Sequence, residues 1–183
     1  IFLYEYSAST SERENLADIR SGEFEGIADK LKTSKWKPDY GPSKPHNTAG
    51  VTAIGARNFL IAYNINLNTK DKKIATDIAL DIREKGRNKR NKNGNFVRDN
   101  NGVPIKVPGI LKDCKAVGWY IDEYGLAQVS MNLTNFNNTP PHIAFEETCN
   151  QSRKRGVRVS GSELVGLIPL DAMVSAGKYY LDK

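Results

Sequence analysis

The feature that most constrains the fold of this chain is an ordered series of apolar patterns that begins at residue 59. The first, "FLIAYNINL" (59–67), alternates apolar and polar residues with period two, which is typical of a strand with one buried face. The second, "DKKIATDIALDIREKG" (71–86), spaces its isoleucines one helical turn apart, and Gly86 is the expected end of that helix. Later patterns predict two strands joined tightly, a helix with Thr139 as its N-cap, and a last strand. They cover 116–124, 126–136, 139–156 and 157–167.

The order of these elements is strand, helix, strand, strand, helix, strand, followed by an amphipathic helix at 169–182. This is the βαββαβ order of a ferredoxin-like domain, so we predict an α+β fold with an extra C-terminal helix, preceded by the end of a second α/β subdomain. In such a domain both helices cover one face of the sheet. The other face would then present five uncharged polar side chains: Asn64, Asn66, Gln128, Ser130 and Asn132. Such a face is either solvated or directed at a ligand or a second domain, and the pattern alone favours neither.

The first 58 residues combine short elements with a constrained loop. "IFLYEY" reads as a strand, "STSERENLADIRSG" as a helix with Ser11 and Glu14 as a capping box, and "GEFEGIADKLK" as a second short helix. The loop "GPSKPHNTAG" (41–50) has two prolines that fix φ and two glycines that permit unusual backbone angles. A loop of this kind either lets a small molecule approach the backbone closely or links two parts of a chain. Because a strand begins at the first residue, we expect a fragment whose upstream portion is absent.

Composition excludes several classes of protein. Hydrophobic residues make up 39% and charged residues 26%, as in ordinary globular domains, and no apolar run reaches the length of a membrane span. Cys114 and Cys149 have neither metal-ligand spacing nor a nearby histidine pair, so we predict no metal and no disulfide framework. We therefore expect a cytoplasmic protein without a membrane partner.

The net charge of +6 is concentrated in one segment, "REKGRNKRNKNGNFVR" (83–98). This segment holds seven Lys or Arg residues and one Glu, whereas acidic and basic residues balance in the rest of the chain. A nucleic-acid binder usually spreads basic residues over a face with several aromatic side chains, and here Phe96 is the only aromatic. We therefore predict no nucleic-acid partner and a solvated, partly disordered loop, with attraction of an anion as the alternative.

Few residues offer catalytic chemistry. His46 lies in the constrained loop, where it could donate to a ligand or stack on it, and His142, in the first turn of a helix, reads as structural or surface-exposed. Neither has a Ser, Cys or carboxylate partner at a recognisable spacing. Glu146 and Glu147 are adjacent on a helix, so their side chains diverge. Glu163 stands between glycine and apolar residues and is expected to be partly buried with a partner. These residues alone name no substrate.

Several segments resemble the formiminotransferase domain of glutamate formiminotransferase, the folate enzyme of histidine degradation. The combination of "GAR.FLIA.NINL" with "SELVGL.PL" is the most specific part of the resemblance. It extends through "IFLYEYSA", "LADIRSGEFEGI", "KPDYGPSKPHNTAG", "VGWYIDEYGLAQVSMNL" and "FEETCNQS", and only the basic segment has no recognised counterpart.

The resemblance implies a fold, a partner and an activity. The family has two subdomains whose sheets face each other and enclose folate, and it forms homodimers. Residues 1–58 would be the end of the N-terminal subdomain and residues 59–183 the C-terminal subdomain. The implied reaction moves a formimino group from N-formimino-L-glutamate to tetrahydrofolate, a co-substrate. The catalytic histidine of the family lies upstream of Ile1, so we expect no catalytic residue here, a missing N-terminal subdomain as partner, and a fragment inactive alone.

The resemblance also implies site residues. The loop 41–50 matches the segment assigned to folate binding, namely Gly41, Pro42, Ser43, Lys44, Pro45, His46, Asn47, Thr48, Ala49 and Gly50. Within this chain, Arg57 is a candidate carboxylate anchor because its guanidinium can pair with two oxygens, with an ion pair at the surface or between subdomains as the alternative. Asn64 and Asn66 are candidates for hydrogen bonds to the pterin or to glutamate amides.

A second hypothesis comes from another functional class. The chain would be a non-catalytic ferredoxin-like binding module that holds an anionic partner through residues 83–98. In a third hypothesis, residues 83–98 would attract the polyglutamate tail of cellular folates.

Overall fold

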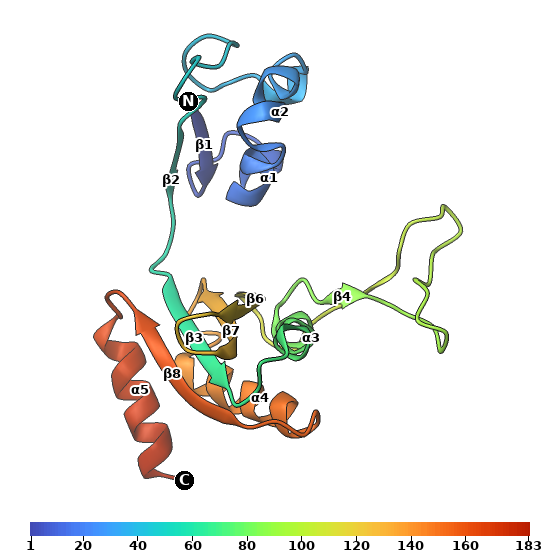
Figure 1. The fold of residues 1–183 in the computed structure, drawn as a ribbon. Helices are drawn as coiled ribbons and strands as arrows, with labels where there is room; N and C mark the ends of the chain where they lie inside the picture. The colour runs from blue at the N-terminus through green and yellow to red at the C-terminus, as the bar shows by residue number, and fades with distance from the viewer. The chain divides into compact units, whose positions relative to one another are not determined.

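A computed structural model describes all residues from 1 to 183 and divides them into two compact units, Ile1–Asn58 and Phe59–Lys183 (Figure 1). The units are described separately. The α+β class expected from the sequence is confirmed, since helices and antiparallel strands both contribute to the second unit.

The second unit is built on a four-stranded sheet in the order β6-β7-β3-β8. The strands are β3 (Ile61–Leu67), β6 (Cys114–Ile121), β7 (Leu126–Leu133) and β8 (Val159–Val165), and every neighbouring pair is antiparallel. Three helices accompany them: α3 (Lys72–Ile82), α4 (Pro141–Arg153) and α5 (Leu170–Leu181). The strands β3 and β7 therefore lie at the centre of the sheet.

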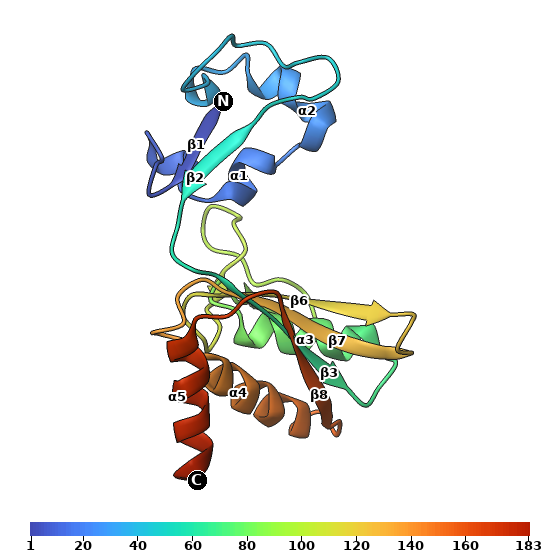
Figure 2. The same ribbon diagram turned by 90° about the vertical axis from the view of Figure 1, so that its left-hand side faces the viewer.

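The hydrophobic core lies on one face of this sheet. Alternate residues of the central strands are buried, as the period-two pattern predicts. They pack with buried residues of all three helices, including Ile78, Ala144 and Ala172. Figure 2 shows α3 and α4 along the same side of the sheet. The opposite face is left without a covering helix in this unit.

Gly118 permits the close packing of β6 against α3. A Cβ atom added there would come within 2.2 Å of the backbone nitrogen of Thr76, nearer than any real contact. A side chain at this position would therefore separate the strand from the helix.

The structure corrects three predicted helix ends. The first long pattern is a 3-10 turn, η1 (Ser11–Arg13), followed by α1 (Leu16–Arg20) with Asn15 as its N-cap, so the capping box of Ser11 and Glu14 is wrong. Thr139 is not the N-cap of α4; its hydroxyl donates instead to the carbonyl of Lys112 at 2.6 Å. The helix α3 ends at Ile82 rather than at Gly86, because Arg83 adopts extended backbone angles.

The basic segment is solvent-exposed, as predicted, but the prediction that it is partly disordered is wrong. Strand β4 (Arg87–Asn88) pairs with β5 (Lys106–Val107), and isolated bridges join Arg90 to Phe96 and Arg98 to Pro104. The sequence 87–107 thus forms a folded arm, seen projecting in Figure 1. The sequence did not predict this pairing, because amino-acid composition does not show which residues of two strands lie opposite each other.

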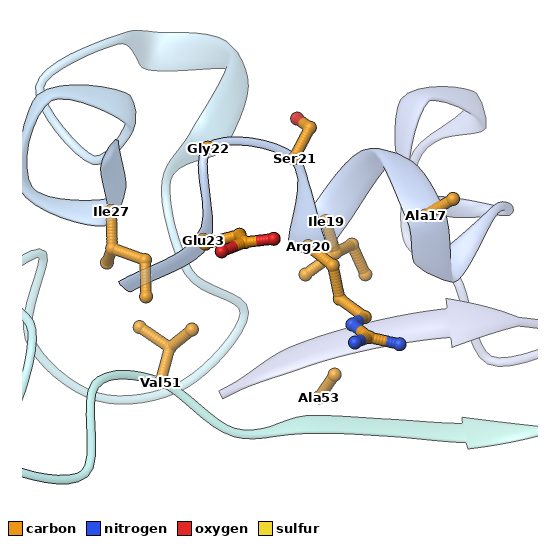
Figure 3. A pocket seen from close by; sticks show the side chains of 9 residues that line it. All are labelled: Ala17, Ile19, Arg20, Ser21, Gly22, Glu23, Ile27, Val51 and Ala53. Carbon is orange, nitrogen blue, oxygen red and sulfur yellow. The ribbon is translucent and has the colours of Figure 1, made fainter. Parts of the chain in front are cut away.

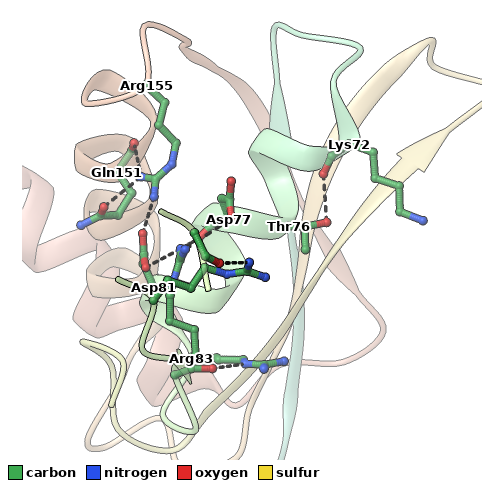
Figure 4. A network of polar contacts seen from close by, with 11 residues as sticks. Lys72, Thr76, Asp77, Asp81, Arg83, Gln151 and Arg155 are labelled. Atoms are coloured by element: carbon green, nitrogen blue, oxygen red, sulfur yellow. Dashed lines mark hydrogen bonds and ion pairs between the residues drawn. The ribbon is translucent and has the colours of Figure 1, made fainter. Parts of the chain in front are cut away.

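An ionic network holds the root of this arm (Figure 4). The Arg87 guanidinium contacts the Asp81 carboxylate at 2.5 Å and the Asp77 carboxylate at 3.4 Å. Arg155, just after α4, pairs with the other oxygen of Asp81 and donates to the carbonyl of Gln151 at 3.0 Å. Asp81 therefore joins the arm to α3 and α4 at one point.

The first unit has a small core around a two-stranded parallel sheet. Strand β1 (Phe2–Glu5) pairs with β2 (Ala53–Ala56), a strand for which the short sequence "AIGA" carries no periodic signal. Buried Phe2, Ile19 and Leu31 pack between this sheet, α1 and the helix α2 (Glu23–Lys30). The 3-10 turn η2 (Ser34–Trp36) adds Trp36, whose ring meets that of Phe2 edge-on.

A buried ion pair stabilises the start of the chain. The Arg13 guanidinium lies 2.6 Å from the Asp39 carboxylate, and both side chains are nearly inaccessible. Asp39 also accepts hydrogen bonds from the backbone N–H of Leu3 at 2.8 Å and from the Ser9 hydroxyl. Burial opposes ionisation, but these hydrogen bonds and the charge of Arg13 together lower the pKa of Asp39.

None of the helices combines the length and apolar character that crossing a membrane requires. No group of three or more His, Cys, Asp or Glu side chains is arranged to hold a metal ion.

Candidate functional site

The uncovered face of the four-stranded sheet carries ordered rows of polar side chains. In one row, Gln128 pairs with Asn66 across the β7–β3 ladder, and in the next row Ser130 pairs with Asn64. Strand β8 adds Glu163 beside Asn64. We call this surface, formed by Asn64, Asn66, Gln128, Ser130 and Glu163, the polar face. The predicted polar side chains thus share one side of the sheet, and Asn132 is exposed two residues further along β7.

Hydrogen bonds connect the polar face around one carboxylate. The amide nitrogens of Asn64 and Gln128 donate to Oε2 of Glu163 at 3.4 and 3.2 Å. The same Gln128 nitrogen donates to Oδ1 of Asn66 at 2.7 Å. Gln128 is only 3% exposed, so its orientation is fixed by these partners. Glu163 is partly buried with partners, as the sequence suggested.

Aromatic side chains border the polar face. Trp119 lies opposite Gln128 in the β6–β7 ladder and is 49% exposed. The hydroxyl of Tyr124, in the turn between these strands, hydrogen-bonds Glu163; this bond and the negative charge of the carboxylate raise the pKa of Tyr124. The arrangement combines acceptor and donor groups with exposed rings, which suits recognition of a flat polar ligand.

The constrained loop lies in the first unit and forms a turn closed by its own histidine. The backbone of His46 exchanges two hydrogen bonds with Gly50, at 2.8 and 3.0 Å. The Nδ1 atom of His46 accepts from the N–H groups of Ala49 at 3.1 Å and Thr48 at 3.3 Å. In the neutral ring Nδ1 is therefore the acceptor and Nε2 carries the proton, available to donate.

A groove with a volume of about 620 Å³ runs beside this loop. It is lined by eight loop residues together with Ile1, Pro38, Tyr40, Val51 and Thr52. Gly50 has a φ of 66°, and a Cβ there would approach the ring of Phe24 to 3.2 Å, so only glycine fits the turn. The loop is thus shaped by its own sequence rather than by a ligand.

A second groove of about 670 Å³ lies between the helices and strands of the same unit. Figure 3 shows the Glu23 side chain between those of Ile27 and Arg20, with Val51 and Ala53 below them. Nothing in the sequence patterns pointed to this groove, because its residues come from three separate segments.

The remaining predicted residues differ in their surroundings. Arg57 is exposed and donates to the carbonyl of Asn58 at 3.2 Å, with no carboxylate partner within the first unit. His142 is 7% exposed and stacks on Tyr179 with ring centroids 4.6 Å apart, so its role is structural, one of the two possibilities that the sequence left open. The carboxylates of Glu146 and Glu147 do diverge: the first accepts from Tyr180 and Lys183, the second from Gln151.

Sequence reasoning missed the contact between Gln128 and Glu163 and the roles of Trp119 and Tyr124. The period-two pattern in β7 identified the face of Gln128 but not its partner on β8, which is two strands away. If the alternation of inward and outward residues in β6 is continued through Gly118, Trp119 falls on the same face as Gln128.

Fold and geometry thus define an α+β domain with one open polar sheet face. Comparison with known proteins identifies it further. Residues 62–183 match the formiminotransferase domain model, and residues 1–57 match the N-terminal subdomain model of the same domain. The chain belongs to the formiminotransferase domain family, and the resemblance noted in the sequence is confirmed.

Similar proteins cover the whole chain. It is 48% identical over its full length to formimidoyltransferase-cyclodeaminase of Dictyostelium discoideum and 44% identical to that of Sus scrofa. It is 43% identical over 99% of its length to glutamate formimidoyltransferase of Streptococcus pyogenes serotype M1. The chain spans 31% of each of the first two relatives and 53% of the third, so all three are considerably longer.

Proposed function

We propose that the protein containing this chain transfers a formimino group from N-formimino-L-glutamate to tetrahydrofolate, as a step of histidine degradation. The observation that carries the proposal is the polar face, a carboxylate fixed among amides on an open sheet, in a chain of the formiminotransferase family. The names of the relatives support the transferase activity.

We assign residues 59–183 to a ferredoxin-like C-terminal subdomain and residues 1–58 to the end of the N-terminal subdomain. The strand order β6-β7-β3-β8, with helices on one face, supports the first assignment. The rest of the N-terminal subdomain is the expected partner of the polar face. We also propose that the intact protein is a cytoplasmic homodimer.

The loop 41–50 would bind folate, as the family resemblance implies. In this proposal Nε2 of His46 is the free donor of the loop, since Nδ1 already serves the turn. Arg57, exposed and without a carboxylate partner in its unit, would bind a carboxylate of either substrate. Asn64 and Asn66 would hydrogen-bond the pterin or a glutamate amide.

The reaction needs proton transfers at nitrogen, a task suited to a histidine near neutral pH. We place the catalytic histidine in the part of the domain that this chain does not cover, as the family resemblance implies. His142 is stacked and buried, and Nδ1 of His46 serves its own turn, which agrees with this placement. This chain then contributes by positioning two substrates together, and it has no transferase activity alone.

Isothermal titration with a stable tetrahydrofolate analogue tests the proposal. The intact protein should bind the analogue and transfer the formimino group, whereas the chain 1–183 should show no transfer. Absence of folate binding by the intact protein would contradict the proposed function.

A further inference from the structure

The carboxylate of Glu163 is a charged group in an otherwise uncharged set of side chains. Its hydrogen-bond partners are two amides and a phenol rather than a cation. A carboxylate that is partly buried without a cationic partner loses solvation without a compensating ion pair. The surrounding donors therefore hold an acceptor group at a defined position, where it can accept a further hydrogen bond.

The two amide donors also fix how the carboxylate is turned. Asn64 and Gln128 both donate to Oε2, and Gln128 is held in turn by Asn66. An ionised carboxylate has about four lone-pair positions. After these two donors and the Tyr124 hydroxyl, acceptor capacity remains on the exposed side of the sheet.

A planar ligand with an amino group at its edge matches such an acceptor. After its three donors, a carboxylate with about four lone-pair positions can accept one further hydrogen bond, and a bond to a charged acceptor is stronger than one between neutral groups. The 2-amino group on the 2-amino-4-oxopyrimidine ring of a pterin is such a donor. We propose that Glu163, oriented by Asn64 and Gln128, accepts a hydrogen bond from this 2-amino group and so determines specificity for the pterin.

Trp119 has a separate place in this arrangement. It projects from β6, three strand spacings or about 14 Å from β8. Trp119 is thus available to stack on the next aromatic ring of a folate, and its fluorescence reports occupancy of the polar face.

The inference rests on the proposed function, and a ligand comparison separates the two. In the intact protein, the dissociation constant is measured for a folate analogue and for its 2-desamino counterpart, with the wild type and with Glu163→Gln. The wild type should prefer the 2-amino compound by about 10- to 100-fold, the effect of a hydrogen bond to a charged group. Glu163→Gln should reduce that preference to about threefold or less.

The outcomes are distinguishable. Binding of neither analogue by the wild type contradicts the proposed function itself. Binding with the same preference in the wild type and Glu163→Gln overturns only the role of Glu163. The matched control is Glu25→Gln on the exposed surface of α2, which should leave both constants unchanged.

If Glu163→Gln does not fold, Glu163→Asp provides the same comparison. It keeps the negative charge but withdraws the carboxylate by one methylene, so the preference should fall by about tenfold. An unchanged preference in a folded Glu163→Asp protein also overturns the assignment.

Discussion

At the scale of single residues, His142 shows how burial changes the meaning of a histidine. Its ring stacks on Tyr179, and its Nδ1 atom is buried without a hydrogen-bond partner. Burial lowers the pKa of His142, although the nearby Glu146 carboxylate partly opposes the shift. Tyr180 of α5 and Lys183 just beyond it donate hydrogen bonds to that carboxylate, at 3.1 and 2.7 Å. The contact between α4 and α5 therefore requires the neutral imidazole.

This arrangement predicts a loss of stability in mild acid. Because the folded-state pKa of His142 is below the unfolded value of about 6.5, the unfolded chain binds a proton first as the pH falls. The stabilisation is complete above about pH 6.5 and is lost progressively below it. His142→Phe should flatten the dependence of the unfolding free energy on pH between 7.5 and 5, measured by urea titration. Tyr179→Phe, which keeps both rings, should retain the wild-type slope.

The pair of Arg13 and Asp39 gives a second prediction at this scale. Asp39→Asn leaves a buried guanidinium without its counter-charge, which costs about 3–5 kcal/mol. Asp29→Asn removes a pair with Lys32 whose side chains are 82% and 75% exposed, and should have a much smaller effect because solvent screens exposed ion pairs. Unfolding of the first unit is followed by Trp36 fluorescence in a Trp119→Phe background. Equal effects of the two variants would contradict the assignment.

Single residues were also where the sequence was least informative. The pattern around Thr139 matches an N-cap, yet the hydroxyl bonds Lys112, far away along the chain. Partners such as Arg13 with Asp39, or Gln128 with Glu163, are brought together only by the tertiary fold. Local patterns carry no information about such contacts.

At the scale of elements, the arm formed by 87–107 is fixed to the domain at Asp81. Its carboxylate meets Arg87 at the root of the arm and Arg155 after α4. The arm itself has few packing contacts with the core, since no residue from 87 to 107 belongs to the buried cluster. Its position thus depends on ionic contacts rather than on apolar burial.

Asp81→Asn should therefore loosen the arm without unfolding the sheet. The change leaves two partly exposed guanidinium groups less well paired, at a cost of about 1–2 kcal/mol. Limited trypsin digestion should cleave faster after Lys89, Arg90 and Lys92, while circular dichroism stays unchanged. Asp171→Asn in the exposed first turn of α5 is the control and should leave the cleavage rate as in the wild type.

Strands were predicted more reliably than helix ends for a physical reason. The alternation in β3 and β7 arises because one face of each strand is buried, so apolar residues occur at every second position of the sequence. The strand β2, only four residues long and mostly exposed, shows no such alternation. The pairing of the arm depends on register, which Asn- and Gly-rich sequence does not specify.

At the scale of the whole molecule, the two units have separate cores. The larger cluster draws only on residues from 61 onward, and the smaller one only on residues up to 53. The second unit combines a four-stranded sheet with three helices, whereas the first has a two-stranded sheet and three buried apolar side chains. A two-stranded sheet with so small a core is marginally stable by itself.

Residues 59–183 expressed alone should therefore unfold cooperatively in urea, with a midpoint close to that of the same unit within the full chain. Residues 1–58 alone should show no cooperative transition. Circular dichroism with Trp36 or Trp119 fluorescence distinguishes the units, because each contains one of the two tryptophans. A cooperative transition of the isolated first unit would show that its core suffices.

The polar face and the core are carried by alternate residues of the same strands, and this restricts how the chain can change over generations. Insertion or loss of one residue within β7 would turn the side of Gln128 inward and that of Val129 outward. Such a change would disrupt both the polar face and the packing of the core. Changes of length are therefore tolerable only in turns and in the arm, while the strands can vary only by replacing one side chain with another.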